Sequence, residues 1–392
     1  MRMNVTYRID KNILYIAIEG RIDASNATQA EEQMLSIKSE NSDKNTVIDA
    51  EGLEYISSAG LRIILRLRRD EPKLAIINVA PDVYDVLDMT GFTDMLTVEK
   101  AYKRMSVDGC EFIAKGANGA VYRYDDETII KTYYSKDALP EIMRERENAR
   151  RAFVLGVNTA IPYGIVRVGD GYGTVTELLN AVNVTKLICD DPENLEKPVE
   201  YYVELLKSIH AIEAEEGDFP NMRDKALKWA EFVSEYLPRE HGDKLTAMLK
   251  ALPAKNILLH GDYHTNNVMV QNGEPLLIDM DTMCVGHPIF ELGSMYNAFL
   301  GFSELDHGAI LKFMGYDRNT SERFWNMVLK KYLNTDDERI CKDVEDKARV
   351  IGYTRLLRRY VRRTDEARAD EHADYYRKRL IEIIDRVDTL EF

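Results

Sequence analysis

The strongest functional signal in the chain is the segment His260-Gly261-Asp262-Tyr263-His264-Thr265-Asn266-Asn267, which follows the apolar run 256–259. A second apolar run, 275–279, leads into Ile278-Asp279-Met280-Asp281. Phosphoryl transfer needs a carboxylate that orients or deprotonates the attacking hydroxyl, and oxygen ligands that hold Mg²⁺ on the nucleotide phosphates. Asp262 on a loop, Asn267 after it and Asp279 at the next strand end can supply both. The stretch therefore predicts a kinase-like site.

A glycine-bearing turn lies upstream, at Lys115-Gly116-Ala117-Asn118-Gly119-Ala120-Val121-Tyr122. The strand-like stretches around it are 112–124 and 128–133. Glycines in such a turn let backbone N–H groups approach phosphates closely. Only Gly116, Gly119 and Val121 match the kinase pattern G-x-G-x-x-G-x-V, because Ala114 stands at the first glycine. The turn is therefore either a phosphate loop or an ordinary β-hairpin.

A candidate phosphate-binding lysine, Lys131, ends the apolar run ten residues after Val121. Its carboxylate partner is expected on the predicted helix 141–155, which offers Glu145 and Glu147. The inward face of that helix carries apolar residues at helical spacing, namely Ile142, Ala149, Ala152 and Phe153. Glu145 lies on this face and Glu147 does not, so we choose Glu145 as the partner. The alternative for both residues is a solvated charge.

Taken in chain order, these features resemble the aminoglycoside phosphotransferase and choline kinase family over residues 110–392. The motifs that carry the resemblance are the glycine turn, Lys131, Glu145, Val175-Thr176-Glu177-Leu178, His260-Gly261-Asp262 with Asn267, and Asp279. His-Gly-Asp in place of His-Arg-Asp, with Leu206-x-x-Ile209-His210 before it, favours this family over ordinary protein kinases. The resemblance implies an α+β, protein-kinase-like bilobal domain, with an N-lobe at about 110–180 and a largely helical C-lobe at about 181–392.

The resemblance also implies ATP as the phosphoryl donor and Mg²⁺ as the cofactor. Asp262 is then the catalytic base, and Asn267 and Asp279 hold Mg²⁺. Lys131 contacts the phosphates, and the other nucleotide-binding positions are Gly116, Gly119, Val121, Glu145 and the backbone of Thr176 and Leu178. Glu291 stands where the family usually has an Asp that braces the catalytic loop, and its extra methylene group is expected to loosen that support.

The first 105 residues predict a separate α/β domain with a mixed sheet covered by helices. Short apolar runs that indicate strands alternate with helical spacing; the strands are 13–18, 47–49 and 75–79, and the helices are 24–37, 60–67 and 83–89. A buried strand, a turn and a helix that opens on two serines follow one another within 47–61. A phosphate on Ser58 would be stabilised at that helix N-terminus. The alternative is that Ser57 or Ser58 is only an N-cap.

The motif Ile48-Asp49-x-x-Gly52-Leu53-x-Tyr55-Ile56-Ser57-Ser58-Ala59-Gly60-Leu61 resembles a STAS domain over residues 1–105. STAS domains occur in anti-sigma factor antagonists and in sulfate transporter tails. The resemblance implies a sheet of four or five strands, an anti-sigma factor or other protein as partner, and a phosphorylatable serine at the position of Ser58. One departure is Ser57, where the family often has Asp.

Composition and residue spacing disfavour several kinds of partner and metal site. The chain of 392 residues carries 52 Lys+Arg against 67 Asp+Glu, a net charge of −15, which disfavours nucleic acid and anionic membranes as partners. No apolar run reaches the ~18 to 20 residues of a membrane span, so we expect a cytoplasmic protein. Its four cysteines lie too far apart for a short metal-binding pair. His264 and His287 lack the spacing of a zinc site.

The sequence therefore predicts an ATP- and Mg²⁺-dependent phosphotransferase joined to a STAS-like switch module, with a small-molecule hydroxyl as the favoured acceptor. No motif after Val199 names that acceptor. The alternative is a signalling or interaction protein whose kinase-like half senses nucleotide or phosphorylates protein. The predicted function does not assign a role to the basic helix 355–363. This helix either pairs with acidic helices, lines a substrate cleft or forms a surface for an anionic partner.

Overall fold

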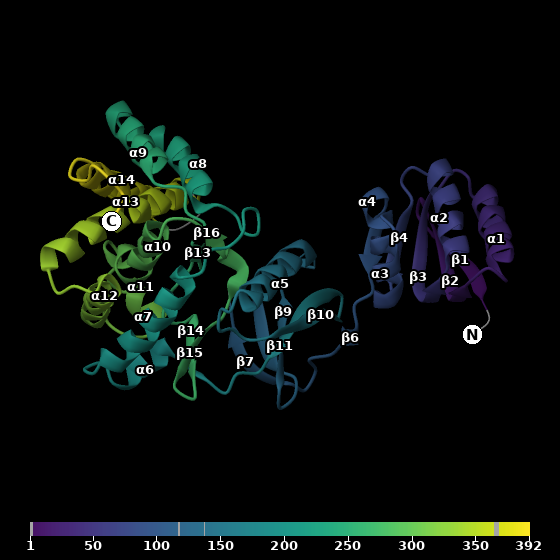
Figure 1. The fold of residues 1–392 in the computed structure, drawn as a ribbon, viewed down its shortest axis with the longest axis horizontal. Helices are drawn as coiled ribbons and strands as arrows, with labels where there is room; N and C mark the ends of the chain where they lie inside the picture. The colour runs from purple at the N-terminus through teal and green to yellow at the C-terminus, as the bar shows by residue number, and fades with distance from the viewer. Residues whose placement is uncertain (1–2, 117, 137, 364–367) are drawn as a thin grey trace. The chain divides into compact units, whose positions relative to one another are not determined.

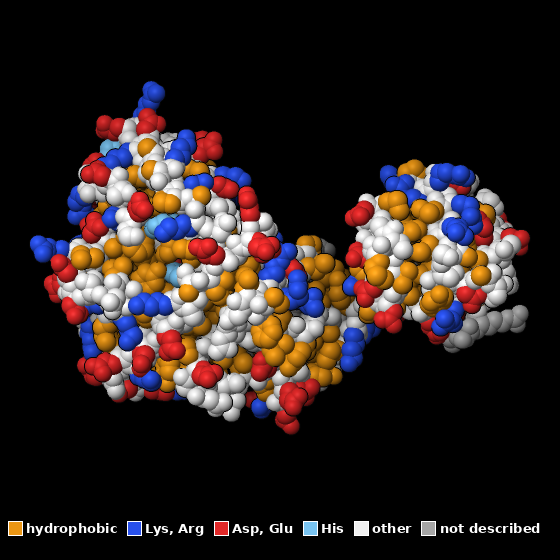
Figure 2. Space-filling view, in the orientation of Figure 1, with side chains coloured by type: hydrophobic (Ala, Val, Ile, Leu, Met, Phe, Trp, Pro, Cys, Tyr) orange, Lys and Arg blue, Asp and Glu red, His pale blue; other side chains and the backbone are white. Residues whose placement is uncertain are grey.

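The computed structural model describes residues 3–116, 118–136, 138–363 and 368–392 (Figure 1). The chain divides into two compact units, Met1–Met105 and Ser106–Phe392. Within the described ranges, no helix has the length and apolar character that crossing a membrane requires. Acidic and basic side chains are interspersed over the visible surface of both units (Figure 2).

The first unit is a five-stranded sheet with helices between the strands. Its elements are β1 (Asn4–Asp10), β2 (Ile13–Ile22), α1 (Ala27–Glu40), β3 (Asn45–Ile56), α2 (Ser58–Asp70), β4 (Ala75–Val79), α3 (Pro81–Met89), α4 (Phe92–Met95) and β5 (Thr97–Lys100), with the two-residue strand β6 (Arg104–Met105) at its end. The strand order is β1-β2-β3-β4-β5. Only β1 runs antiparallel to its neighbour, and the other strands are parallel, so the predicted mixed sheet is confirmed.

The second unit begins with an antiparallel sheet of strand order β10-β11-β9-β8-β7. The elements are β7 (Glu111–Lys115), β8 (Gly119–Arg123), β9 (Thr128–Tyr133), α5 (Leu139–Val154), β10 (Pro162–Val168) and β11 (Gly171–Glu177). Helix α5 packs on β10 and β11 and on the short 3₁₀ helix η1 (Met280–Thr282). This contact brings the helix beside the loop that follows Asp279.

The remainder of this unit is mainly helical. Its helices are α6 (Val184–Asp190), α7 (Glu196–His210), α8 (Met222–Ser234), α9 (Arg239–Ala251), α10 (Ile289–Phe299), η2 (Gly301–Ser303), α11 (Ala309–Met314), α12 (Arg318–Leu333), α13 (Glu338–Arg362) and α14 (Ala369–Ile384). Two small sheets lie among them, β12 (Val182–Asn183) with β14 (Val268–Gln271) and β15 (Glu274–Leu277), and β13 (Leu258–Leu259) with β16 (Cys284–Val285). One hydrophobic core joins this region from Ala152 to Leu390.

Several sequence-based strand predictions were wrong. The predicted strand 112–124 is two strands, because the chain turns between Lys115 and Gly119. The predicted strand 275–279 ends at Leu277, since Asp279 has a left-handed backbone with φ of 65° that no strand contains. Strands β1, β5 and β14 were not predicted; β1, for example, is almost wholly exposed and carries no apolar run.

Gly119 is required by packing. A Cβ at this position would lie 1.9 Å from the carbonyl oxygen of Thr132 on β9, whereas a Cβ at Gly116 would meet nothing nearer than 3.8 Å. The two glycines of the turn therefore do different things. Gly119 lets β8 pair closely with β9, and Gly116 leaves open space beside the turn.

We predict that Gly119→Ala lowers the stability of the protein by about 1–3 kcal/mol, because the sheet backbone must move to accommodate the methyl group. Gly116→Ala, the matched control, is expected to change stability by less than about 0.5 kcal/mol. Thermal unfolding followed by circular dichroism measures both. Equal midpoints for the two variants would contradict this account.

Candidate active site

The predicted catalytic loop, His260 to Asn267, connects β13 to β14 and is tied to the segment after Asp279. Gly261 has φ of 82°, and a Cβ there would lie 2.5 Å from the carbonyl oxygen of Thr282, so only glycine fits. The Thr282 hydroxyl donates to the carbonyl oxygen of His260 at 2.7 Å. The His260 ring nitrogen Nε2 lies 2.8 Å from the carbonyl oxygen of Asp279. The two polar segments thus form one structure.

Glu291 on α10 holds this loop through hydrogen bonds to its backbone. Its carboxylate is fully buried and accepts hydrogen bonds from the backbone N–H of His260 at 2.5 Å and of Gly261 at 3.0 Å. The extra methylene group of Glu291 thus does not prevent its carboxylate from reaching the loop. The longer side chain starts from a helix position that lets it reach both donors.

Asp262 presents a partly exposed carboxylate, with 46% of its side chain accessible. Its Oδ2 lies 3.7 Å from Nε2 of His264. Burial by itself raises the pKa of Asp262, but His264 and the positive charge of Arg355 outweigh burial and hold the pKa below its ordinary value. The carboxylate is therefore ionised at neutral pH and can accept a proton.

Asn267 and Asp279 lie on adjacent backbone segments, because the N–H of Ile278 donates to the carbonyl oxygen of Asn267 at 3.0 Å. The Asn267 amide nitrogen donates to the carbonyl oxygen of Asp262 at 3.1 Å. This bond fixes the amide so that its oxygen, for which no partner is recorded among the described residues, stays available. The Asp279 carboxylate is 46% exposed. Two hard oxygen donors are thus available for a cation of the Mg²⁺ type.

Lys131 on β9 lies between two carboxylates. Its Nζ is 2.7 Å from Glu145 on α5 and 3.7 Å from Asp279. Burial alone lowers the pKa of Lys131, but these two negative charges outweigh it and raise the pKa well above its ordinary value. Tyr133 donates to the other oxygen of Glu145 at 2.9 Å, which fixes the carboxylate. Val121 is the residue opposite Lys131 in the β8–β9 pair.

Glu147 points elsewhere. Its carboxylate accepts hydrogen bonds from Arg150 and Arg151 at 2.8 Å, and these bonds lower its pKa to about 2. The structure therefore brings Glu145, and not Glu147, to Lys131. The inward face of α5, read from its apolar residues, is sufficient to separate the two.

The predicted adenine contacts need one correction. The backbone N–H of Leu178 already donates to the carbonyl oxygen of Glu127 at 2.7 Å, because the linker after β11 runs beside the turn between β8 and β9. That donor is occupied within the protein, whereas the described residues record no partner for the carbonyl group of Leu178. Among the described residues no partner is recorded for the N–H of Leu179, which is the next donor along the linker.

Some residues of the site were missed by sequence reasoning. Arg355 on α13 donates to the carbonyl oxygen of Gly261 at 3.3 Å and to the Ser294 hydroxyl at 2.7 Å. His264 lies beside the carboxylate of Asp262, and Tyr133 donates to the carboxylate of Glu145. The sequence signal for Arg355 was the basic helix, but nothing in the pattern placed that helix over the catalytic loop. In the described ranges no group of three or more His, Cys, Asp or Glu is arranged to hold a metal ion.

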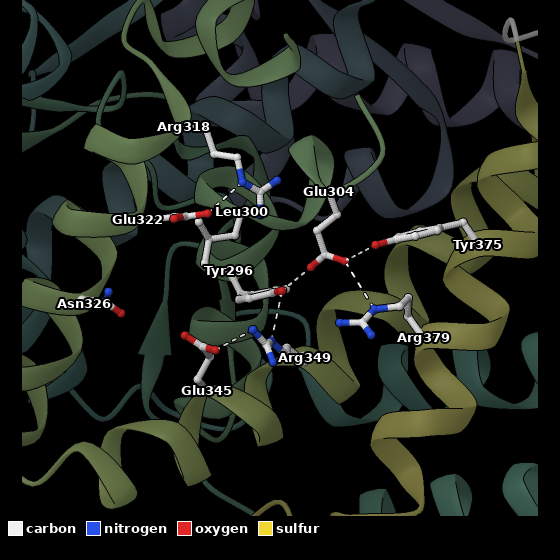
Figure 3. Close-up of a pocket in the computed structure, with 10 residues that line it drawn as sticks. All are labelled: Tyr296, Leu300, Glu304, Arg318, Glu322, Asn326, Glu345, Arg349, Tyr375 and Arg379. Carbon is white, nitrogen blue, oxygen red and sulfur yellow. Dashed lines mark hydrogen bonds and ion pairs between the residues drawn. The ribbon is translucent and has the colours of Figure 1, made fainter. Parts of the chain in front are cut away.

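A separate cavity of about 340 Å³ lies among α10, α12, α13 and α14 (Figure 3). Its charges are neutralised by each other. Glu304 accepts from the hydroxyl groups of Tyr353 at 2.7 Å and Tyr375 at 3.2 Å, and lies 3.7 Å from Arg379. Arg349 pairs with Glu345 at 2.7 Å. These contacts explain the charged residues as a network that joins the helices.

In the first unit, Ser58 is the first residue of α2 and is exposed. Ser57 is the N-cap residue, and its hydroxyl oxygen accepts from the N–H of Gly60 at 3.5 Å. Of the two serines, the capping role therefore falls to Ser57. The Ser58 hydroxyl has no recorded hydrogen bond among the described residues and stands where the helix dipole is positive.

Two family models match the chain, one in each of its two compact units. The model of the phosphotransferase enzyme family matches residues 109–322, and that of the STAS domain matches residues 4–105. The chain belongs to the phosphotransferase enzyme family and carries a STAS domain ahead of the phosphotransferase domain. BtrV of Bordetella bronchiseptica, which carries the name of an anti-sigma factor antagonist, is 30% identical over 100 residues that span 24% of this chain and 85% of that protein.

Solved structures are similar to the chain at low identity. The ADP-bound aminoglycoside phosphotransferase APH(2'')-Ib is 17% identical, with a TM-score of 0.48 over 78% of this chain and 99% of that one. A choline/ethanolamine kinase family protein from Mesorhizobium loti is 13% identical, with a TM-score of 0.46 over 70% of this chain and 87% of that one.

Proposed function

We propose that the chain transfers the γ-phosphoryl group of ATP to the hydroxyl of a small molecule, with Mg²⁺ as cofactor, and that its STAS domain is a regulatory module of the anti-sigma factor antagonist type. One observation carries the first part. Lys131, fixed by Glu145, lies 3.7 Å from Asp279, and the backbone of Asp279 is hydrogen-bonded to the loop that presents Asp262. The membership in the phosphotransferase enzyme family supports it.

Asp262 is the proposed general base. Its carboxylate is ionised, open to solvent on one side and held by a loop whose backbone is braced by Glu291. In the proposed reaction the acceptor oxygen forms a bond to the γ-phosphorus as the bond to the leaving ADP oxygen breaks. The proton of the acceptor hydroxyl goes to Asp262.

The nucleotide would lie between the β-sheet and the catalytic loop. Lys131 would contact the phosphates, and the linker after β11 would meet the adenine through the carbonyl group of Leu178 and the N–H of Leu179. The oxygen of Asn267 and the carboxylate of Asp279 would hold Mg²⁺, which would neutralise charge on the phosphates when bound. Gly116, with open space around it, is the better candidate for phosphate approach than Gly119.

The STAS domain supports a second, regulatory activity. The family model matches residues 4–105, and Ser58 is exposed at the N-terminus of α2. A phosphate on Ser58 would bring about −1.5 to −2 charges to this helix end. The proposed consequence is a change in which protein surface the STAS domain can bind, an anti-sigma factor being the candidate partner.

We expect Asp262→Asn to reduce phosphoryl transfer by about 10²- to 10⁴-fold, because the amide cannot accept the proton. Nucleotide affinity should stay close to that of the wild type. Transfer is measured with labelled ATP and a panel of hydroxyl acceptors, and affinity by calorimetry. A wild-type rate in this variant would exclude Asp262 as the base, and nucleotide binding without any turnover in the wild type would favour a sensor over an enzyme.

We expect Glu145→Gln to weaken use of ATP, since Lys131 loses the charge that orients it, whereas Glu147→Gln should not. Both variants lose one negative charge from the same helix, which makes the second a matched control. The ratio kcat/KM for ATP is the measurement, with an expected fall of about 10-fold or more for Glu145→Gln. Equal losses in the two variants would show that the pairing with Lys131 has no role.

The regulatory proposal predicts that Ser58 is phosphorylated, by the phosphotransferase domain or by a partner kinase. Intact-mass measurement after incubation with Mg-ATP, with and without cell lysate, should show one added phosphate on the wild type and on Ser57→Ala, and none on Ser58→Ala. Phosphate on all three proteins, or on none of them, would remove Ser58 from the mechanism.

A further inference from the structure

Four positive side chains line one side of the C-terminal helices beside the catalytic loop. Arg355, Arg358 and Arg362 recur on α13 at spacings of three and four residues, so they lie along one stripe of the helix. Lys225 on α8 flanks the same stripe, because the buried ring of Trp229 lies 5.7 Å from its Nζ and 5.8 Å from the Arg358 guanidinium. We call these four residues the basic stripe.

The basic stripe begins at the catalytic loop. The Arg355 guanidinium donates to the carbonyl oxygen of Gly261, the residue before Asp262, and its charge helps to lower the pKa of Asp262. From Arg355 to Arg362 the helix advances about 10 Å at its normal rise per residue. Arg355 and Arg358 are partly buried, whereas Arg362 is exposed. The stripe thus leads from the reacting group to the surface over the length of a small molecule.

The charges of the basic stripe have no recorded acidic partner in the part of the chain that the structure describes. Among the described residues, no ion pair is recorded for Lys225, Arg355, Arg358 or Arg362, in a chain with 67 acidic residues. Burial, followed by the charges of Arg362 and Arg355, lowers the pKa of Arg358. Like charges are therefore held together at a cost that no acidic side chain among the described residues is recorded to offset.

Arginines elsewhere on α12 and α13 have acidic partners. Arg349, less than two turns before Arg355 on α13, pairs with Glu345 at 2.7 Å and Asp346 at 3.1 Å. Arg318 pairs with Glu322 at 2.8 Å on α12 (Figure 3). In that network each guanidinium meets a carboxylate and has a structural role. The arginines of this network thus differ from those of the basic stripe, for which the described residues record no ion pair.

We propose that the phosphate acceptor is an anion, a small hydroxyl compound with a phosphate or carboxylate group that binds on Arg358 and Arg362 while its hydroxyl lies at Asp262. This inference rests on the proposed function and names its substrate class. Guanidinium groups bind phosphate and carboxylate through paired hydrogen bonds, and an anion would relieve the repulsion among the arginines. The same charges would repel a cationic acceptor. The reaction is the one given above, with the proton transferred to Asp262.

Four six-carbon sugar derivatives test the charge preference, namely glucose, glucose 6-phosphate, gluconate and glucosamine. Their binding to the full chain carrying Asp262→Asn is measured by calorimetry with Mg-ATP present, so that the readout does not depend on turnover. We expect glucose 6-phosphate or gluconate to bind at least about 10-fold more tightly than glucose, and glucosamine most weakly. Comparison of the two anions separates phosphate from carboxylate as the preferred group.

Variants then assign the preference to the basic stripe. Arg358→Gln and Arg362→Gln should each weaken binding of the preferred anion by about 10-fold, and Arg358→Lys should restore part of the loss. Arg239→Gln on α9 removes the same charge from a side chain that is 96% exposed, and it should leave binding unchanged. Unfolding midpoints of all the variants check that each is folded.

The inference would be overturned by equal binding of the four compounds, by absence of binding by both anions, or by equal effects of Arg239→Gln and Arg358→Gln. Transfer from ATP to a neutral acceptor with an unchanged KM in Arg358→Gln would leave the proposed function intact and remove the anionic acceptor. Failure of the wild type to bind ATP at all would instead remove the proposed function.

Discussion

Two hydrogen bonds from backbone N–H groups to the buried carboxylate of Glu291 fix the part of the chain on which the candidate site is built. The donors are His260 and Gly261, and the residues that would do chemistry follow directly in the chain. A buried carboxylate is costly unless its oxygens have donors, and a buried N–H is costly unless it has an acceptor. Each group therefore satisfies the other, and the loop has one low-energy position.

Main-chain contacts also fix the position of Asp279. Its backbone is left-handed, its carbonyl oxygen lies against the ring of His260, and its side chain points to the region of Lys131. The site is thus assembled mainly through main-chain groups, with the reactive carboxylates left partly open to solvent. This arrangement separates the residues that hold the site from those that would act in it, as phosphoryl transfer by positioning and charge requires.

Much of this arrangement could be predicted from the sequence, because periodicity and short motifs are local. The face of α5 that carries Ile142 separates Glu145 from Glu147, and the structure places only Glu145 beside Lys131. What could not be predicted depends on contacts between distant segments. The hydrogen bond from Leu178 to Glu127 and the contact of Arg355 with Gly261 depend on how separate elements pack together. The residue pattern within one element does not show which part of another element it will meet.

Helices α13 and α14 change how the boundary of the catalytic domain is to be understood. The family match ends at residue 322, yet the hydrophobic core runs on to Leu390, and the Tyr376 hydroxyl donates to the carbonyl oxygen of Gly301 at 2.7 Å. The segment that matches the family model is thus shorter than the segment that packs into one domain. The residues after 322 therefore belong to the same packed unit as the matched residues, and the fold of that unit depends on them.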